Sequence, residues 1–414
     1  MRILVISQYY DPEPFKVSDL CRELYKKGHR LSVITSVPNY PDGQKYIGYR
    51  NFHPFFENDK GIKIVRIPVI KRGRSNIKLA LNYISYSLLS SIFVLFIFNK
   101  YDLVYIYQLS PVFMAVPGIV FSKLRKIPLL LYCLDIWPDS FFEITGIKSK
   151  AIKNILISIC NNIYKQSNLI AVSSKSFRNR FIEIGFSEDK ISTIPQYDDT
   201  IGEMLIDQSY IINKYNNYRD YFDIYFTGNV GFAQNLDIVL DAAEIIKESG
   251  YKIRWNIVGD GRAKSYLIKK AKNKGLENIV LFFPRIEKNK ISDTLSHAHA
   301  ALLILGNSEL FSLTVPAKLQ TYMANSIPIL GCVNGESANI IVESNSGFIA
   351  EQEDPRDLAK KAIMLASSNP EKLIRMAMNA KAYYNKYFTK EQHIEKMVDF
   401  MTSGLISKKS NENA

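Results

Sequence analysis

The residues with the clearest chemical potential lie around a single lysine. The run Pro316-Ala317-Lys318 opens a short amphipathic helical pattern, and an apolar strand pattern follows from Ile327. The first residues of a helix leave backbone N–H groups unbonded and carry the positive end of the helix dipole, and both features attract anions. Lys318 adds a mobile positive charge at this helix start. The pattern therefore predicts a phosphate-binding site.

Two glycine-rich turns earlier in the chain support this prediction. The strand pattern over 224–227 ends in Gly228-Asn229-Val230-Gly231, and the strand pattern over 255–258 ends in Gly259-Asp260-Gly261-Arg262. In open parallel sheets, ligands bind beyond the carboxyl ends of the strands, where such turns gather. One corner of this kind is common for steric reasons alone. Two of them, together with the turn at Lys318, favour a phosphate ligand.

The cysteines and histidines do not form a recognisable metal-binding pattern. The four cysteines, Cys21, Cys133, Cys160 and Cys332, are scattered through apolar patterns, which predicts reduced, structural thiols. His297 and His299 are two residues apart, and on a helix this spacing directs them away from each other. We therefore expect no metal and no other cofactor.

The elements that must position these residues alternate between strand and helix along the whole chain. This alternation predicts a doubly wound α/β fold, and a length of 414 residues predicts two domains. The pattern breaks in a stretch rich in Tyr, Asn and Asp. We expect a first domain over 1–197, a linker over 198–222 and a second domain over 223–385. A terminal helix and polar tail over 386–414 could pack back on the first domain.

The positive charge is concentrated in one part of the chain. Of the net charge of +13, seven basic residues and no acidic residue lie in 60–78, and the next twenty residues, 79–98, carry no charge. This length permits a transmembrane helix, but strand patterns on both sides would then place one sheet across a bilayer. We expect instead a helix docked on anionic lipid beside a basic patch, with a helix buried in the domain as the alternative. The charge is not accompanied by a base-reading motif, so nucleic acid is not an expected partner.

The start of the chain bears on its location. Met1 runs directly into a strand pattern over 2–6, without the features of a signal peptide. We therefore expect a cytoplasmic protein that is peripheral to the inner membrane.

Together these motifs resemble glycosyltransferase family 4, whose members are retaining enzymes of the GT-B architecture, with two Rossmann-like domains facing a central cleft. In the C-terminal half the resemblance is carried by the two glycine turns, by 316–324 and by Gly335-Glu336-Ser337-Ala338. In the N-terminal half the motifs at 7–14, 37–43 and 135–140 are similar to the branch that adds N-acetylfucosamine and other amino sugars in bacterial O-antigen or capsule assembly.

The resemblance implies a role for each motif. The second domain would bind a UDP-sugar donor through Gly228, Asn229, Gly231, Gly259, Gly261, Arg262, Arg285, Lys318 and Glu336. The first domain would bind the acceptor through Glu13, Asn39 and Tyr40. Asp135 would orient or deprotonate the acceptor hydroxyl, with a helix N-cap as the alternative. A retaining reaction of this kind needs no enzyme nucleophile, and no metal where helix ends and cations neutralise the departing diphosphate.

Some positions depart from the usual family pattern. Asn229 and Gln234 stand where many members carry a basic pair, and Thr321 stands where the second of two glutamates would fall. We interpret these changes as a rearranged site in which Lys318 carries more of the phosphate charge; loss of activity is the alternative.

The expected function is transfer of an N-acetylated amino or deoxyamino sugar to a polyprenyl-diphosphate-linked saccharide. A UDP-sugar 2-epimerase of the same fold would bind the same donor but would need no lipid-facing basic segment. A non-catalytic membrane scaffold would explain that segment but not the three turns. The sugar, the linkage, the acceptor and the oligomeric state stay open.

Overall fold

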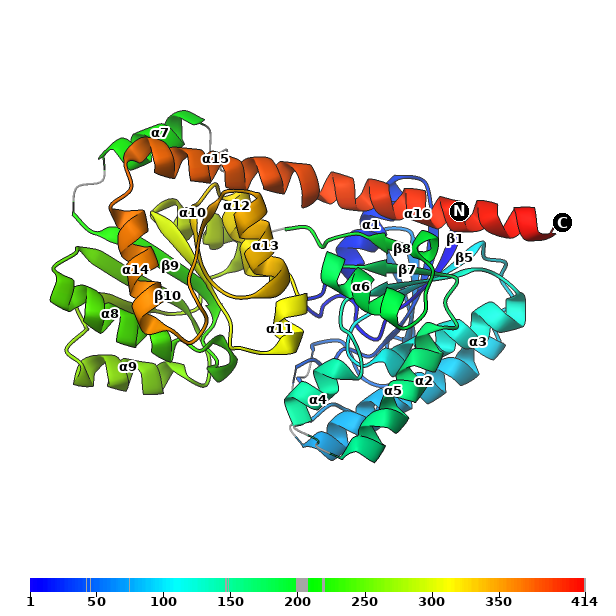
Figure 1. Cartoon of the computed structure of the whole chain (residues 1–414). Helices are drawn as coiled ribbons and strands as arrows, with labels where there is room; N and C mark the ends of the chain where they lie inside the picture. The colour runs from blue at the N-terminus through cyan, green and yellow to red at the C-terminus, as the bar shows by residue number, and fades with distance from the viewer. Residues whose placement is uncertain are drawn as a thin grey trace. The chain divides into compact units, whose positions relative to one another are not determined.

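The computed structural model describes residues 1–41, 43–44, 46–73, 75–145, 147, 149–198, 208–217 and 220–412. Asp42 of the motif at 37–43 and Arg74 of the basic stretch lie outside these residues. The chain folds into two compact units: unit 1 comprises residues 1–194 and 394–414, and unit 2 comprises residues 195–393. Each unit contains a mainly parallel sheet covered by helices (Figure 1). The doubly wound α/β class expected from the sequence is confirmed.

Unit 1 is built on a sheet of eight strands, all parallel except that β3 runs antiparallel to its neighbour β4. Across the sheet the order is β3 (Phe56–Asp59), β4 (Ile62–Ile67), β2 (Arg30–Ser36), β1 (Arg2–Ile6), β5 (Leu103–Gln108), β6 (Leu129–Cys133), β7 (Leu169–Val172) and β8 (Ile191–Thr193). The central strands are continuous apolar runs because helices cover both of their faces. The loops that follow β1, β2, β4 and β6 consequently lie at one edge of the sheet, which we call the carboxyl edge of unit 1.

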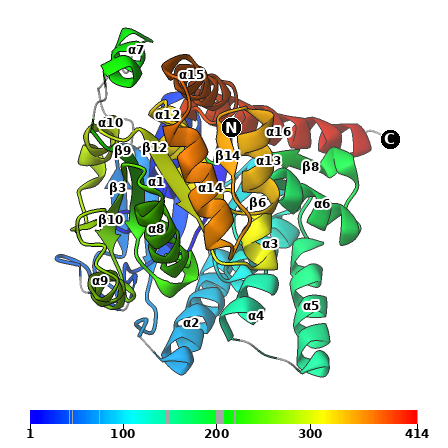
Figure 2. The same ribbon diagram turned by 60° about the vertical axis from the view of Figure 1, so that its left-hand side comes forward.

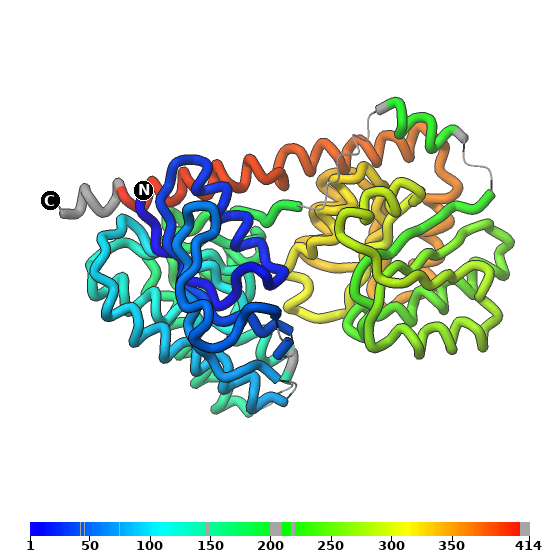
Figure 3. Tube along the Cα trace, turned by 180° about the vertical axis from the view of Figure 1, so that it is seen from behind, coloured from blue at the N-terminus to red at the C-terminus, as the bar shows by residue number. Residues whose placement is uncertain are grey.

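The helices of unit 1 divide between the two faces of this sheet. Helix α1 (Val17–Lys26) and the C-terminal helix α16 (Lys390–Glu412) share a hydrophobic core with Ile3 and Val5 of β1, and Figure 3 shows α16 running past the first strand. The other face carries the remaining helices of this unit (Figure 2). These are α2 (Asn76–Leu95), α3 (Val116–Arg125), α4 (Asp139–Thr145), α5 (Lys150–Tyr164) and α6 (Lys175–Glu183).

Helix α2 has a polarity opposite to that of an ordinary surface helix. Its buried residues are Asn82, Tyr86, Ser87, Ser90 and Val94, three of them polar, whereas its exposed residues are largely aliphatic. The exposed aliphatic side chains are Ile77, Leu81, Ile84, Leu88, Leu89, Ile92 and Leu95. By length and composition, α2 alone among the described helices could span a membrane, and 28% of its most apolar window is buried. The alternative of a helix simply buried in the domain is therefore wrong.

Unit 2 is built on a six-stranded, wholly parallel sheet. Its order is β11 (Val280–Phe283), β10 (Ile253–Asp260), β9 (Phe222–Asn229), β12 (Ala300–Ile304), β13 (Ile329–Cys332) and β14 (Gly347–Ile349). Alternate residues of β12 enter different cores: Leu302 packs with α8 and α14, whereas Leu303 packs with α12 and α13. Figure 1 shows these two helix pairs on opposite sides of the sheet.

The helices of unit 2 follow its strands in turn. They are α7 (Gln208–Asn217), α8 (Asp237–Ser249), α9 (Lys264–Asn273), α10 (Ile291–Ser296), α11 (Glu309–Leu313), α12 (Ala317–Ala324), α13 (Gly335–Glu343), α14 (Pro355–Ala366) and α15 (Pro370–Tyr387). Helix α7 lies in the stretch expected to be an irregular linker. Its residues Ile211 and Tyr215 are buried in the core of unit 2, so part of that stretch belongs to the domain.

Candidate functional site

Lys318 lies at the carboxyl ends of the unit 2 strands, where the sequence placed it. Its Nζ donates a hydrogen bond to Gln234 Oε1 at 2.6 Å and lies 4.0 Å from the centroid of the Phe226 ring. In the described part of the chain this ammonium has no carboxylate partner, and burial lowers the pKa of Lys318 to about 7. A cation held in this way gains charge stabilisation when an anion arrives.

Tyr322 fixes the helix that carries this lysine. It lies one turn after Lys318 on α12, and its Oη accepts a hydrogen bond at 3.0 Å from the backbone N–H of Thr227, directly before Gly228. The helix start is thereby attached to the end of β9. We did not single out Tyr322 from the sequence, although its spacing of four residues from Lys318 places both on one helix face.

The glycines of the two turns make close approach possible. Gly228 and Gly259 are paired across β9 and β10 and have φ angles of +132° and +152°. A Cβ on Gly228 would lie 2.7 Å from Cε of Lys318, and a Cβ on Gly259 would collide with the carbonyl oxygen of Gly228. Gly261 is packed against the carbonyl of Val230 in the same way. The structure therefore brings Gly228, Gly259, Gly261 and Lys318 together.

The other side chains expected to bind the donor are those of Asn229, Arg262, Arg285 and Glu336. Asn229 is exposed, and its side-chain amide lies against glycines of both turns. A Cβ on Gly231 would be 2.7 Å from its Nδ2, and a Cβ on Gly261 would be 2.8 Å from its Oδ1. Arg262 and Arg285 are exposed, without an ion pair in the described residues. Glu336 is buried in the first turn of α13.

A second lysine reaches the ends of the neighbouring strands. Lys264 Nζ donates hydrogen bonds of 2.7 Å to the carbonyl oxygens of Gly259 and Phe283, the last or nearly last residues of β10 and β11. Sequence reasoning missed this residue and chose Arg262 instead. Its position three residues after Gly261 is the only sequence signal.

In unit 1, Glu13 connects the loops that follow β1 and β2. Its Oε1 accepts hydrogen bonds of 2.8 Å from the backbone N–H groups of both Asn39 and Tyr40. The side chain is buried, and Oε2 has no hydrogen-bond partner among the described residues. Burial raises the pKa of Glu13 to about 7, although the two backbone hydrogen bonds oppose that shift.

Asn39 and Tyr40 differ in how much of each side chain is available. The Asn39 amide donates to Val37 O at 2.7 Å and accepts from Arg72 N and Asn82 Nδ2, both at 3.1 Å, so internal contacts occupy it. The Tyr40 ring packs edge-on against the rings of Tyr9 and Phe15. Asn39 thus holds the loops in place, and Tyr40 contributes an aromatic surface.

Asp135 follows β6 at the same carboxyl edge. Its Oδ2 accepts a hydrogen bond of 3.1 Å from the indole Nε1 of Trp137, and burial raises its pKa. The next helix, α4, begins only at Asp139, and no described backbone N–H donates to the Asp135 carboxylate. The N-cap interpretation therefore lacks support, and the Asp135 carboxylate lies beside the Trp137 ring, with the side chains of Ser140 and Ser110 as further partners.

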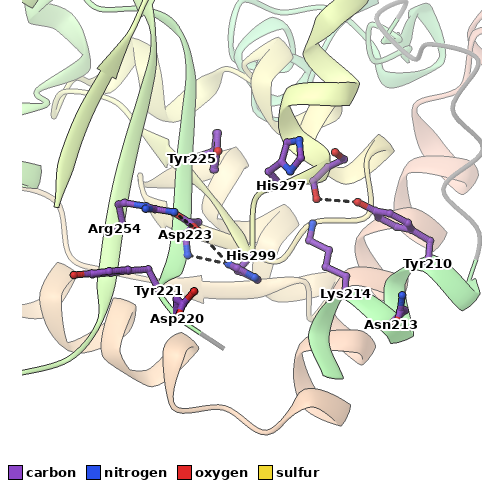
Figure 4. A pocket seen from close by; sticks show the side chains of 11 residues that line it. Tyr210, Asn213, Lys214, Asp220, Tyr221, Asp223, Tyr225, Arg254, His297 and His299 are labelled. Atoms are coloured by element: carbon purple, nitrogen blue, oxygen red, sulfur yellow. Dashed lines mark hydrogen bonds and ion pairs between the residues drawn. The ribbon is translucent and has the colours of Figure 1, made fainter. Parts of the chain in front are cut away.

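A cavity of about 570 Å³ lies at the other end of the unit 2 strands (Figure 4). Within it, Asp223 pairs with Arg254 at 2.6 Å and donates its backbone N–H to His299 Nδ1 at 2.9 Å. Burial, with Lys214 nearby, lowers the pKa of His299 to about 4, so this imidazole is neutral. The glycine turns lie at the opposite edge, so the cavity is separate from the phosphate site.

Models of known protein families match both halves of the chain. A family model described as Glycosyltransferase Family 4 matches residues 17–197, and one described as Glycosyl transferases group 1 matches residues 207–383. The chain is 26% identical over 303 residues to WcaI of Escherichia coli (strain K12), a glycosyl transferase that its name assigns to colanic acid biosynthesis. This match covers 69% of the chain and 72% of WcaI.

Solved structures resemble the whole chain. Sucrose-phosphate synthase from Thermosynechococcus elongatus has a TM-score of 0.69 at 13% identity, covering 98% of this chain and 99% of that one. Anabaena HepE in complex with UDP and glucose has a TM-score of 0.65 at 15% identity, with 97% and 100% covered. WaaG, a glycosyltransferase involved in lipopolysaccharide biosynthesis, has a TM-score of 0.62 at 14% identity, with 97% and 100% covered. The GT-B fold expected from the sequence is confirmed.

Proposed function

The chain belongs to glycosyltransferase family 4, and from this premise we propose that it transfers a sugar from a UDP-sugar to a lipid-linked saccharide with retention of configuration. The observation that carries this proposal is the position of Lys318, whose ammonium lies beside Gly228 without a carboxylate partner among the described residues. A cation at a helix start, beside a glycine turn, suits a diphosphate. The UDP bound in the HepE structure supports UDP as the nucleotide.

The proposed reaction exchanges one bond of the sugar for another. The bond from the anomeric carbon to the diphosphate oxygen breaks, and a bond forms to the acceptor hydroxyl oxygen on the same face. The acceptor proton passes to the departing phosphate. Lys318 and the N–H groups of the turn at Gly228 would stabilise the charge that develops on the diphosphate, so the transfer would need no metal.

The acceptor would bind at the carboxyl edge of unit 1. Tyr40 offers an aromatic face there, Glu13 retains an unpartnered carboxylate oxygen in the described residues, and Asp135 would orient the attacking hydroxyl. The name of WcaI supports a role in the synthesis of a bacterial surface polysaccharide such as O-antigen or capsule. We propose an N-acetylated amino or deoxyamino sugar as the transferred group.

A lipid-linked acceptor would require the enzyme to work at a membrane surface. The exposed aliphatic face of α2 and the basic residues before it suit the cytoplasmic face of an anionic bilayer. Helix α5 adds a second exposed row, Ile152, Ile155 and Ile159. Peripheral attachment through these faces is part of the proposal.

The decisive experiment is calorimetric titration of UDP with EDTA present. We expect wild-type protein to bind UDP, and Lys318→Ala to raise the dissociation constant at least tenfold, or about 1.4 kcal/mol. Lys252→Ala is the matched control, because Lys252 is exposed just before the amino end of β10, away from the turns. Unchanged affinity in the Lys318 variant would contradict the diphosphate assignment, and absence of UDP binding would contradict the choice of nucleotide.

A further inference from the structure

Arg72 differs from the other arginines near the carboxyl edge of unit 1. Arg22 pairs with Asp11 and Asp59, and Arg66 pairs with Glu57. Arg72 forms no ion pair with any described residue, although its side chain is partly buried. A partly desolvated cation without a counter-charge is costly, which makes this residue stand out.

Several contacts hold the backbone of Arg72 in one position. Its backbone N–H donates to Asn39 Oδ1 at 3.1 Å, and the same oxygen accepts from Asn82 Nδ2 of α2. Gly43, at φ +76°, packs against the carbonyl of Arg72, where a Cβ would collide. The peptide is therefore fixed between the loop after β2 and the start of α2.

The guanidinium of Arg72 is also oriented. Its Nη1 donates to Tyr9 Oη at 2.7 Å, and its Cζ lies 5.2 Å and 5.5 Å from the ring centroids of Tyr40 and Tyr83. Aromatic faces stabilise a guanidinium without neutralising it. Of its five N–H donors, only the one bound to Tyr9 has an acceptor among the described side chains and carbonyls. The others are available to a ligand.

The chemistry of the ligand follows from these donors. A planar guanidinium recognises phosphate oxygens through paired hydrogen bonds, and Arg is favoured over Lys where such pairing is required. Arg72 lies in the loop after β4, at the edge that carries Glu13 and Tyr40, and four residues before the apolar helix α2. An anion bound here would lie where the saccharide site meets the lipid-facing helix.

We propose that Arg72 binds a phosphate of the diphosphate that links the acceptor saccharide to its lipid. This inference rests on the proposed function and adds a subsite to it. The sequence alone assigned Arg72 to a basic patch for lipid headgroups. The structure assigns it to the acceptor site, because its side chain lies on Tyr9, Tyr40 and Tyr83.

The test is binding of farnesyl diphosphate in neutral detergent, with UDP present in excess to occupy the diphosphate site of unit 2. We expect wild-type protein to bind farnesyl diphosphate, and Arg72→Gln to weaken binding about tenfold. Arg72→Lys, which keeps the charge but not the planar donors, should fall between them. Lys63→Gln is the matched control, because Lys63 is an exposed residue of β4 in the same basic stretch. Farnesol, which lacks phosphate, should not distinguish Arg72→Gln from wild type.

A second arm separates the acceptor diphosphate from lipid headgroups. Sedimentation with vesicles of phosphatidylcholine and phosphatidylglycerol should be unchanged by Arg72→Gln and reduced by Lys71→Gln, whose side chain is exposed. The inference would be overturned if Arg72→Gln reduced vesicle binding and left farnesyl diphosphate binding unchanged, or if wild type bound no farnesyl diphosphate. Failure of UDP itself to bind would instead overturn the proposed donor, which the calorimetric titration detects independently.

Discussion

At the scale of single residues, the two units use buried charge differently. Unit 2 keeps a cation, Lys318, without a carboxylate partner in its described surroundings, and burial lowers its pKa to about 7. Unit 1 keeps an acid, Glu13, whose pKa burial raises to about 7. Burial therefore favours the neutral form of both groups, and each can change its charge when a ligand binds.

Glu13 gives a pH-dependent prediction. Its pKa is raised from 4.5 to about 7 by folding, so it favours the folded state below about pH 4.5, and that contribution is lost as the pH rises through 7. Glu13→Gln keeps an oxygen acceptor for the N–H groups of Asn39 and Tyr40 but cannot ionise. Between about pH 5 and pH 8, we expect the free energy of unfolding of wild type to fall by about 2.5 kcal/mol relative to this variant.

Urea unfolding at the two pH values measures this difference directly. The exposed Glu188→Gln serves as a control, because its carboxylate pairs only at the surface with Arg178. Parallel pH dependences for wild type and Glu13→Gln would show that Glu13 is already ionised at low pH, and would remove it as a group that changes charge on acceptor binding.

At the scale of elements, the inverted polarity of α2 is the main departure from a soluble domain. A surface helix normally turns its apolar stripe towards the core. Here the buried side uses Asn82, which binds Gln8 and Asn39, and the aliphatic residues face outward. The buried Asn82 therefore connects α2 to the loops that follow β1 and β2, while the exposed side of α2 is largely aliphatic.

Charge placed on this face should prevent membrane attachment. Leu88 and Ile92 are 59% and 54% exposed, so Leu88→Glu with Ile92→Glu should leave the free energy of unfolding within about 0.5 kcal/mol of wild type. We expect the double variant to lose at least about tenfold in binding to anionic vesicles, measured by sedimentation. Val342→Glu, on an exposed residue of α13 in unit 2, is the control. Undiminished vesicle binding would contradict a docking role for α2.

At the scale of the whole molecule, the proposed function assigns the donor to one unit and the acceptor to the other. Each unit has its own mainly parallel sheet and core, and the loops assigned to each proposed site follow the carboxyl ends of its strands. Ile394, Met397 and Met401 of α16 belong to unit 1 and pack in the same core as α1. The terminal segment is thus part of the N-terminal unit, although the family model for the second half ends at residue 383.

This division predicts which unit binds UDP. In hydrogen exchange measured by mass spectrometry, saturating UDP should slow exchange most in peptides that contain residues 226–236 and 316–324 of unit 2. The peptide over 37–41 of unit 1 is the internal control, since it carries acceptor loop residues only. Protection in that peptide, with the two unit 2 peptides unchanged, would place the nucleotide on the wrong unit and contradict the assignment.

Local patterns in the sequence were enough for the α/β alternation, for the glycine turns and for the helix start at Lys318, whose role in anion binding stays a prediction. They succeeded because strand periodicity, glycine at a strand end and lysine at a helix start depend on neighbouring residues. The sequence did not predict strands β3, β4 and β8, and the interpretation of 60–78 rested on its basic residues. Within that segment, Ile62, Ile64 and Ile67 mark a strand.

Only the tertiary structure decided which residues complete the sites. Gln234 is 84 residues from Lys318, and Thr227 is 95 residues from Tyr322, so neither hydrogen bond could be foreseen from local pattern. The same holds for Arg72, which the sequence places in a basic run and the fold places on Tyr9, 63 residues away. Parallel strands bring together loops that are distant along the chain, and burial then determines which charged groups among them keep their charge available for a ligand.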